Sequence, residues 1–251
     1  DPATCQSDPV KLRGRVEKVR RDGKLKPRAI VGVDLFGQPA PWDALREIAS
    51  DYGLFLMDDC AQSFGGAYHG RNLGAEAVAT TLSFFPSKPL GGYGDGGAIL
   101  TDDAERADLY RSLRTHGEGK TRYQVLRTGM NGRLDTLQAA VLLAKLDVFK
   151  EELTRRDAIA DAYDAGLKDV VTVPARVPDS ASAWAIYAVL LKDSAERTVT
   201  QARPTAAGVP SATDYPLPLP HHPAYLDPHD RVAPPVSAPP ASADTPASLL
   251  H

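Results

Sequence analysis

The sequence is poor in cysteine, with only Cys5 and Cys60 among 251 residues. Two cysteines cannot build the set of disulfide bridges that holds small secreted domains together. No Cys/His spacing typical of a zinc site is present either. We therefore expect neither a disulfide framework nor a bound metal. Cys60 follows an apolar run, which favours a small buried side chain over a reactive thiol.

Long apolar runs and a strong net charge are also missing. No run is long enough to span a bilayer, and the first residues do not combine a charged start with an apolar stretch. A formal net charge of -3 gives no general attraction to nucleic acid. Basic residues do gather between positions 11 and 28, which indicates a solvated helix or, alternatively, a phosphate-binding face. We predict a cytoplasmic protein that binds neither membrane nor nucleic acid.

The first third of the chain has the pattern of alternating strands and helices. Residues 29–37 form a continuous apolar run, typical of a strand buried on both faces of a parallel sheet. Helical spacing follows over residues 42–52 and stops at Gly53, before another apolar run at residues 54–57. Strand, helix and strand in close succession predict a right-handed βαβ unit. We therefore expect an α/β fold with a mostly parallel sheet and helices on both faces.

The most informative stretch is residues 80–100, which contains an apolar strand, a loop with Lys88 between two prolines, and a glycine-rich return into a second strand. Because Phe84, Phe85 and Leu90 flank Lys88, we expect its amine to be partly desolvated and usable as a nucleophile toward an aldehyde. The alternative is a surface lysine whose stem lies along the core while its charge stays in water.

Two carboxylates follow the apolar run at residues 54–57. Asp58 and Asp59 fall at the carboxyl end of a predicted parallel strand, where open α/β sheets place their ligands. A carboxylate there and a lysine after the next strand match what pyridoxal phosphate requires, since the acid keeps the ring nitrogen protonated and the lysine holds the aldehyde. Strand alternation sends Asp58 and Asp59 to opposite faces, so we expect only one of them to face a ligand.

Four segments occur in an order that resembles the pyridoxal-phosphate-dependent sugar aminotransferases of the DegT/DnrJ/EryC1/StrS family. The segments are Asp58-Asp59-Cys60-Ala61-Gln62, Ser83 to Lys88, Gly94-Asp95-Gly96-Gly97 and Asn131-Gly132-Arg133-Leu134-Asp135. The resemblance implies the aspartate-aminotransferase-like fold, known as fold type I. It implies a large cofactor-binding domain over residues 1–150 and a smaller C-terminal α/β domain over residues 151–251. We also expect the family's opening helices, first strands and Gly-Thr phosphate turn to lie outside this sequence.

The resemblance assigns five residues to the cofactor, pyridoxal 5'-phosphate. Lys88 would bind its aldehyde and then move the proton at the substrate carbon, while Asp59 rather than Asp58 would pair with the pyridine nitrogen. Gln62 resembles the residue that contacts the ring hydroxyl, and Ser83 resembles a phosphate ligand. Asn131 resembles the residue that reaches the phosphate site of a neighbouring subunit. For Ser83 and Asn131 the alternative is an ordinary turn residue.

Three more residues resemble substrate-binding positions, namely Ser87, Arg133 and Tyr215. Arg133 suits a diphosphate or carboxylate because its guanidinium can bind two oxygens at once, although a salt bridge with Asp135 is an alternative. Tyr215 begins a Tyr-Pro-x-Pro-Leu segment that still resembles the family. Prolines are dense beyond it, so we expect residues 232–250 to be irregular.

The implied reaction transfers an amino group from an amino acid, expected to be L-glutamate, to a nucleotide-linked keto-sugar. The motifs are nearest to members that aminate UDP-linked 3-keto-hexuronic acids for amino-sugar and surface-polysaccharide synthesis. A dTDP-4-keto-hexose aminotransferase is one alternative, and a truncated relative that dimerises or binds ligand without turnover is another. A dehydratase of the same fold would carry histidine in place of Lys88.

A long helix is predicted from residue 134 onward and is apolar over more than one face. The resemblance implies a homodimer with shared active sites, and an interface would cover such a helix. The alternative is a central core helix in a monomer.

Overall fold

The computed structural model describes residues 1–121, 123–217, 219–222, 225 and 249–250. Its residues form two compact units. The first contains Asp1, Cys5–Ala160 and Arg176–Ala185, and the second contains Pro2–Thr4, Asp161–Ala175 and Ile186–His251. The boundary expected between residues 150 and 151 falls inside one continuous helix, α4 (Thr136–Leu167). The division in the structure lies ten residues later, after Ala160.

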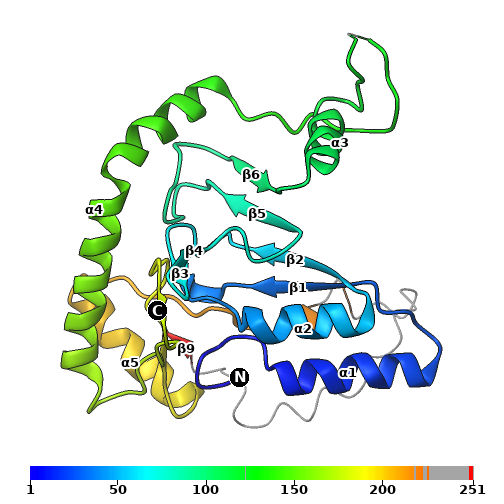
Figure 1. Cartoon of the computed structure of the whole chain (residues 1–251). Coiled ribbons are helices and arrows are strands. Elements are labelled where there is room, and N and C mark those ends of the chain that lie inside the picture. The colour runs from blue at the N-terminus through cyan, green and yellow to red at the C-terminus, as the bar shows by residue number, and fades with distance from the viewer. Residues whose placement is uncertain (122, 218, 223–224, 226–248, 251) are drawn as a thin grey trace. The chain divides into compact units, whose positions relative to one another are not determined.

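A four-stranded sheet in the order β1-β2-β5-β6 is the centre of the first unit (Figure 1). The strands are β1 (Ala29–Val33), β2 (Phe55–Asp59), β5 (Ala79–Ser83) and β6 (Gly97–Leu100). The first three are parallel, and β6 is antiparallel to β5. In the register, Asp59 pairs with Val33 on one side and Thr81 on the other. The predicted mostly parallel α/β sheet is confirmed.

Three further helices belong to the first unit: α1 (Pro9–Asp22), α2 (Trp42–Tyr52) and α3 (Ala104–Arg114). Asp8 caps α1 by accepting hydrogen bonds from the backbone N–H groups of Val10 and Lys11. Gly53 ends α2 in the left-handed conformation at φ 62°. The end of α2 at Gly53 is as the sequence predicts. Among the described residues, no helix is both long and apolar enough to cross a membrane.

The first predicted strand is shorter than expected. It was predicted over residues 29–37 but ends at Val33, and a 3-10 turn over Leu35–Gly37 follows. Phe36 has φ 62° and Gly37 has φ 105°, and neither angle is compatible with an extended strand. The chain therefore turns sharply just beyond the carboxyl end of β1.

Helix α2 packs against one face of the sheet. Trp42 and Leu45 are fully buried and lie directly over Gly32, where a Cβ atom would come within 2.9 Å of Leu45 Cδ1. Burial of side chains of this size contributes roughly 1.5–3 kcal/mol each. On the opposite face, Val31 and Ile99 are each more than half exposed. The core of the first unit therefore lies between the sheet and α2.

A short antiparallel sheet includes residues of the glycine-rich segment after β2. Its strands are β3 (Ala67–Tyr68), β4 (Arg71–Asn72) and β7 (Ser180–Ala181). β3 is central and pairs with both others. Two-residue strands are too short to show alternation, so the sequence pattern could not reveal them.

Helix α4 is apolar around most of its circumference, yet the chain buries only part of it. Leu142 and Phe149 are buried, and Phe149 stacks on Phe64 with the ring centroids 5.6 Å apart. In contrast, Leu137 is 76% exposed and Leu143 is 67% exposed. Within the described residues, α4 is therefore not buried as a central core helix.

The second unit contains α5 (Ser194–Ala206), the 3-10 helix η2 (Leu219–His221) and the antiparallel pair β8 (Val189–Leu190) and β9 (Leu249–Leu250). An isolated bridge between Thr172 and Leu190 joins the segment after α4 to β8. Helix α5 was not predicted, although Asp193 caps it by accepting from Glu196 N. The expectation for residues 232–250 lies outside the described residues except at β9.

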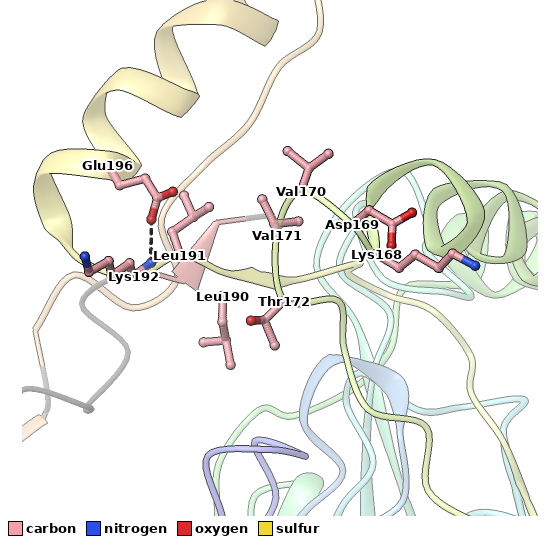
Figure 2. Close-up of a pocket in the computed structure, with 9 residues that line it drawn as sticks. All are labelled: Lys168, Asp169, Val170, Val171, Thr172, Leu190, Leu191, Lys192 and Glu196. Atoms are coloured by element: carbon pink, nitrogen blue, oxygen red, sulfur yellow. Dashed lines mark hydrogen bonds between the residues drawn. The ribbon is translucent and has the colours of Figure 1, made fainter.

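A pocket of about 390 Å³ lies in the second unit between the Lys168–Thr172 segment and the start of α5 (Figure 2). The backbone N–H of Lys192 donates to Glu196 Oε2 at 2.7 Å across its edge. This bond satisfies a helix-terminal group, and none of the predicted site residues lines the pocket. We therefore place the candidate site in the first unit.

Candidate active site

The candidate site lies at the carboxyl edge of the sheet, where β1, β2 and β5 end. Asp59 is the last residue of β2 and is half-buried, and its Oδ1 accepts the backbone N–H of Ala61 at 3.1 Å. Asp58 is fully buried on the other face of the strand. A fully buried carboxylate cannot meet a ligand at the open edge, which favours Asp59 over Asp58 as the cofactor residue.

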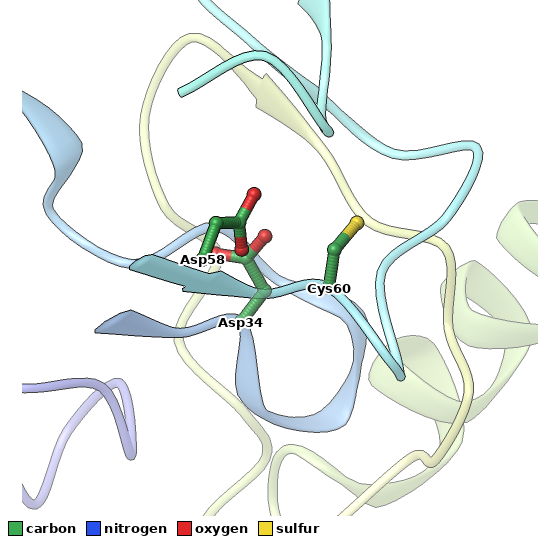
Figure 3. Close-up of side chains that lie close together, drawn as sticks. All are labelled: Asp34, Asp58 and Cys60. Atoms are coloured by element: carbon green, nitrogen blue, oxygen red, sulfur yellow. The ribbon is translucent and has the colours of Figure 1, made fainter. Parts of the chain in front are cut away.

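Asp58 belongs to a buried group with Asp34 and Cys60 beneath the strand ends (Figure 3). One potential ligand atom from each side chain lies within 4.8 Å of the others. Burial, with a smaller contribution from the charge of Asp34, raises the pKa of Asp58 to about 8. Burial also raises the pKa of Asp34 to about 6, while hydrogen bonds from Ala40, Ser63 and Trp42 lower it. Near neutral pH, Asp58 is therefore protonated and Asp34 is ionised.

Cys60 forms part of a short hydrogen-bond chain. Ser63 Oγ lies 2.8 Å from Asp34 Oδ2 and 3.0 Å from Cys60 Sγ. A hydroxyl has one proton, so Ser63 donates to the carboxylate and the thiol donates to Ser63. Burial raises the pKa of the Cys60 thiol. The prediction of a small buried cysteine without thiolate reactivity agrees with this setting.

Gln62 follows Asp59 on the turn that leaves β2. Its Oε1 accepts the backbone N–H of Phe36 at 2.6 Å. This contact uses the amide oxygen and leaves the amide NH₂ group as the donor of the half-buried side chain. The NH₂ group of Gln62 is therefore the part of the side chain that remains able to donate hydrogen bonds.

Lys88 lies at the end of a tight turn beyond β5. Its backbone N–H donates to Phe85 O at 2.9 Å, and the side chain is half-buried. Ser83 Oγ accepts the N–H of Phe85 at 3.3 Å, which is the turn role foreseen as its alternative. The hydroxyl proton of Ser83 is not used in that bond. The turn thus places Lys88 and Ser83 beyond the same strand end.

Two residues of α4 support this loop and were not foreseen. Lys145 Nζ donates to Gly91 O at 2.6 Å, and Gln138 Oε1 accepts the N–H of Tyr93 at 2.7 Å. Gly91 is required here because a Cβ atom would lie 2.8 Å from Phe85 O and even closer to Pro86 O. Polar residues on an otherwise apolar helix were the only available signal in the sequence.

The remaining predicted residues are separate from this group in their described contacts. Arg133 Nε donates to Asn131 Oδ1 at 3.0 Å, and both residues are exposed. The alternative pairing of Arg133 with Asp135 is absent from the described ion pairs, since Asp135 Oδ1 accepts Leu137 N instead. Ser87 is exposed in the Lys88 turn. Tyr215 belongs to the second unit and is 57% exposed.

A groove of about 1000 Å³ runs along β5, β6 and α3. Leu82, Phe84, Ala98 and Tyr110 contribute to its largely apolar lining, and Arg114 lies among them. None of the eight predicted residues lines it. The predicted chemistry therefore lies at the strand ends rather than in this groove.

Comparison with known proteins identifies one family over almost the whole chain. A family model described as the DegT/DnrJ/EryC1/StrS aminotransferase family matches residues 1–243. The "UDP-2-acetamido-2-deoxy-3-oxo-D-glucuronate aminotransferase" of Pseudomonas aeruginosa is 45% identical over 229 residues, which cover 90% of this chain and 60% of that protein. The "dTDP-3-amino-3,4,6-trideoxy-alpha-D-glucose transaminase" of Streptomyces venezuelae is 38% identical over 80% of this chain and 52% of that protein.

Two solved structures resemble this chain along its whole length. A DegT DnrJ EryC1 StrS aminotransferase from Brucella abortus superposes with a TM-score of 0.91 at 40% identity, covering 100% of this chain and 65% of that one. S. venezuelae DesV, solved in complex with a ketimine intermediate, gives 0.87 at 33% identity, covering 100% and 64%. These likenesses confirm the predicted fold class. The chain spans about 60% of the length of the first of these curated relatives.

Proposed function

Because the chain belongs to the DegT/DnrJ/EryC1/StrS aminotransferase family, we propose that it transfers an amino group to a nucleotide-linked keto-sugar with pyridoxal 5'-phosphate as cofactor. One observation carries the proposal. Asp59 ends β2, and Lys88 follows the neighbouring strand β5 at the same carboxyl edge of the sheet. That edge is where α/β sheets bind ligands, and an acid and a lysine are the two side chains this cofactor needs.

The residues present fit the cofactor. When bound, it supplies an electron sink for the bonds at the substrate carbon. Lys88 would hold it through its amine and, once released, take and return the proton at that carbon. Asp59 would keep a proton on the ring nitrogen, and Gln62 would donate its amide hydrogens to the ring hydroxyl. Ser83, whose hydroxyl proton is not used within the turn, would donate to the phosphate.

The phosphate site would be completed by Asn131 from a second copy of the chain. Exposed apolar residues on α4 support a homodimer, since Leu137 and Leu143 are each at least two-thirds exposed. Large exposed apolar areas of this kind are typical of subunit interfaces. A cytoplasmic setting is part of the proposal, and the free thiols of Cys5 and Cys60 fit a reducing compartment.

For the acceptor we propose a UDP-linked 3-keto-hexuronate, with L-glutamate as amino donor. Support comes from the 45% identity to the P. aeruginosa protein with a UDP-3-oxo-glucuronate substrate in its name. Exposed Arg133 and Ser87 would bind acidic groups of the substrate, and Tyr215 is the third residue proposed to contact the substrate. The runner-up is a dTDP-keto-hexose, since the S. venezuelae relative named for a dTDP-sugar is 38% identical. Amination assays with both acceptors distinguish the two, because the proposal requires the UDP-hexuronate to be preferred.

The cofactor proposal is tested by absorbance of the purified chain with pyridoxal phosphate, before and after borohydride reduction. We expect a visible band that borohydride fixes covalently in the wild type and in Lys18→Ala, which changes an exposed lysine of α1. Lys88→Ala should lack the fixed cofactor. If the wild type binds none, the alternative of a relative without turnover gains support and the proposal fails for this chain.

A further inference from the structure

Asp34 is a buried charged residue that the proposed reaction does not use. It follows β1 directly and is 0% exposed. Its Oδ1 accepts the backbone N–H of Ala40 at 2.7 Å and the indole N–H of Trp42 at 2.9 Å. Its Oδ2 accepts the hydroxyl of Ser63 at 2.8 Å. The three donors come from the segment after β1, from α2 and from the turn after β2, so one carboxylate joins three separate parts of the chain.

The same residue holds both ends of the turn that carries the candidate cofactor residues. Its backbone N–H donates to Asp59 O at 3.2 Å, where the turn begins. Its carboxylate holds Ser63, where the turn closes through a hydrogen bond from Ser63 N to Cys60 O at 3.2 Å. Asp59 and Gln62 lie between these two attachments. Movement of either would therefore strain the contacts of Asp34.

A second contact fixes the direction of Gln62. Its Oε1 accepts the N–H of Phe36, which has φ 62° in the segment just after Asp34. The next residue, Gly37, has no room for a side chain, since a Cβ atom would lie 2.8 Å from Trp184 N. The segment after β1 is thus closely packed, and it can serve as a rigid support for the turn.

We propose that Asp34 is the positioning residue of the cofactor site, which ties the 60–63 turn to the 35–42 segment and so sets where Asp59 and Gln62 present their polar atoms. The proposal rests on the proposed function, because Asp59 and Gln62 are cofactor residues only there. Asp34 acts through these residues and does not itself face the open edge.

The surroundings of Asp34 favour a single ionised carboxylate. Asp58 faces it from β2 with Oδ2 bound by the Thr80 hydroxyl at 3.2 Å and Oδ1 without a described partner. Glu76 and Asp59 add further negative charge nearby. Two buried negative charges side by side would repel, so Asp58 is neutral and the charge stays on the carboxylate with three donors.

The test compares Asp34→Ala, Asp34→Asn and Ser63→Ala with Ile48→Ala. Ile48 is a core residue of α2 that is 1% exposed, and its truncation lowers stability through lost apolar packing while leaving every hydrogen bond of Asp34 in place. The first readout needs no cofactor and is the amide hydrogen exchange of Phe36, Ala61 and Ser63. We expect these amides to exchange at least about tenfold faster in Asp34→Ala than in Ile48→Ala, since the hydrogen bonds to the Asp34 carboxylate are lost. Ser63→Ala should accelerate Ala61 and Ser63 alone.

The second readout is the dissociation constant for pyridoxal phosphate, measured by fluorescence quenching. Asp34→Ala should bind about tenfold or more weakly than Ile48→Ala. Asp34→Asn should restore most of the affinity, because its oxygen still accepts from Ala40 and Trp42 while its amide can donate to Ser63. If the asparagine variant binds as weakly as the alanine variant, positioning by these bonds is wrong.

The two proposals fail in different ways. A wild type that binds no pyridoxal phosphate overturns the proposed function, while the exchange rates still decide whether Asp34 holds the turn. If the amide exchange rates of Ala61 and Ser63 are the same in Asp34→Ala as in the wild type, Asp34 does not position the turn, even if the cofactor binds. A stoichiometric metal ion that purifies with the wild type and is lost from Asp34→Asn would also overturn it, because the carboxylate would then be a ligand.

Discussion

Asp34 and Asp58 lie at the ends of neighbouring parallel strands with a carboxylate oxygen of each within 4.8 Å of the other, and both side chains are fully buried. Ionising both carboxyl groups is strongly unfavourable in free energy in a medium of low dielectric constant. The hydrogen bonds decide which one does, since Asp34 has three donors and Asp58 has one. The pair therefore sets the pH dependence of stability.

Asp58→Asn is expected to stabilise the protein increasingly as pH rises. The pKa of Asp58 is raised by burial to about 8, above its unfolded value, so between about pH 4 and 8 the folded state holds a proton that the unfolded state has lost. Stability therefore falls across this window and levels off above it. The asparagine cannot ionise and removes that slope, a gain of a few kcal/mol at about 1.4 kcal/mol per pKa unit.

Urea midpoints of both proteins between pH 6.5 and 9 measure this gain. Asp34, with a folded-state pKa of about 6, is mostly ionised over that range, so the difference reports mainly Asp58. Asp22→Asn, at the exposed end of α1, is the control and should follow the wild type. A constant difference between Asp58→Asn and the wild type at every pH would contradict the prediction.

Gly91→Ala is expected to destabilise the turn that presents Lys88. The new Cβ atom would lie 2.8 Å from Phe85 O, so the backbone must shift, at a cost of about 1–3 kcal/mol typical of overpacking. The control is Gly14→Ala in α1, where nothing lies within 4 Å of the new atom. That change should stabilise by roughly 0.5–1 kcal/mol because alanine favours helix. If the denaturation midpoints of both variants shift in the same direction, the turn is not closely packed around Gly91.

Local signals in the sequence were reliable where one or two residues decide the structure. Gly53, for example, predicted the end of α2. The strand after residue 29 was predicted too long because its end depends on Phe36, whose positive φ is stabilised by a bond to Gln62 twenty-six residues away. A propensity argument has no access to such a contact.

The site was predicted unevenly for the same reason. Asp58 and Asp59 were selected because they end a parallel strand, and the same rule would have selected Asp34 at the end of β1. Asp34 was missed because the strand was predicted to continue to residue 37, which placed Asp34 inside the strand rather than at its end. Lys145 was missed because it reaches Gly91 across fifty-four positions of the chain, and an apolar helix gives no indication of which loop it supports.

Lys145→Met is expected to loosen the glycine loop while preserving most of the apolar packing of the side chain. The change removes the hydrogen bond from Lys145 Nζ to the buried residue Gly91, which should cost about 1–3 kcal/mol. The N–H of Gly92, which donates to Phe84 O at 2.8 Å, should then exchange faster with solvent. Lys150→Met is the matched control on an exposed position of the same helix. Equal exchange of Gly92 in the two variants would show that Lys145 does not support the loop.

Leu143→Glu is expected to convert a dimer into monomers if α4 forms the interface. Leu143 is 67% exposed on a helix with further exposed leucines at positions 137 and 146, and a charge placed in a buried interface is strongly unfavourable. Sedimentation velocity of the wild type should show a dimer, and the variant should sediment as a monomer with unchanged secondary structure. Val10→Glu is the control, because Val10 is 82% exposed on α1, away from any predicted contact. A monomeric wild type would remove the basis for a shared active site, and a dimeric Leu143→Glu would move the interface to another surface.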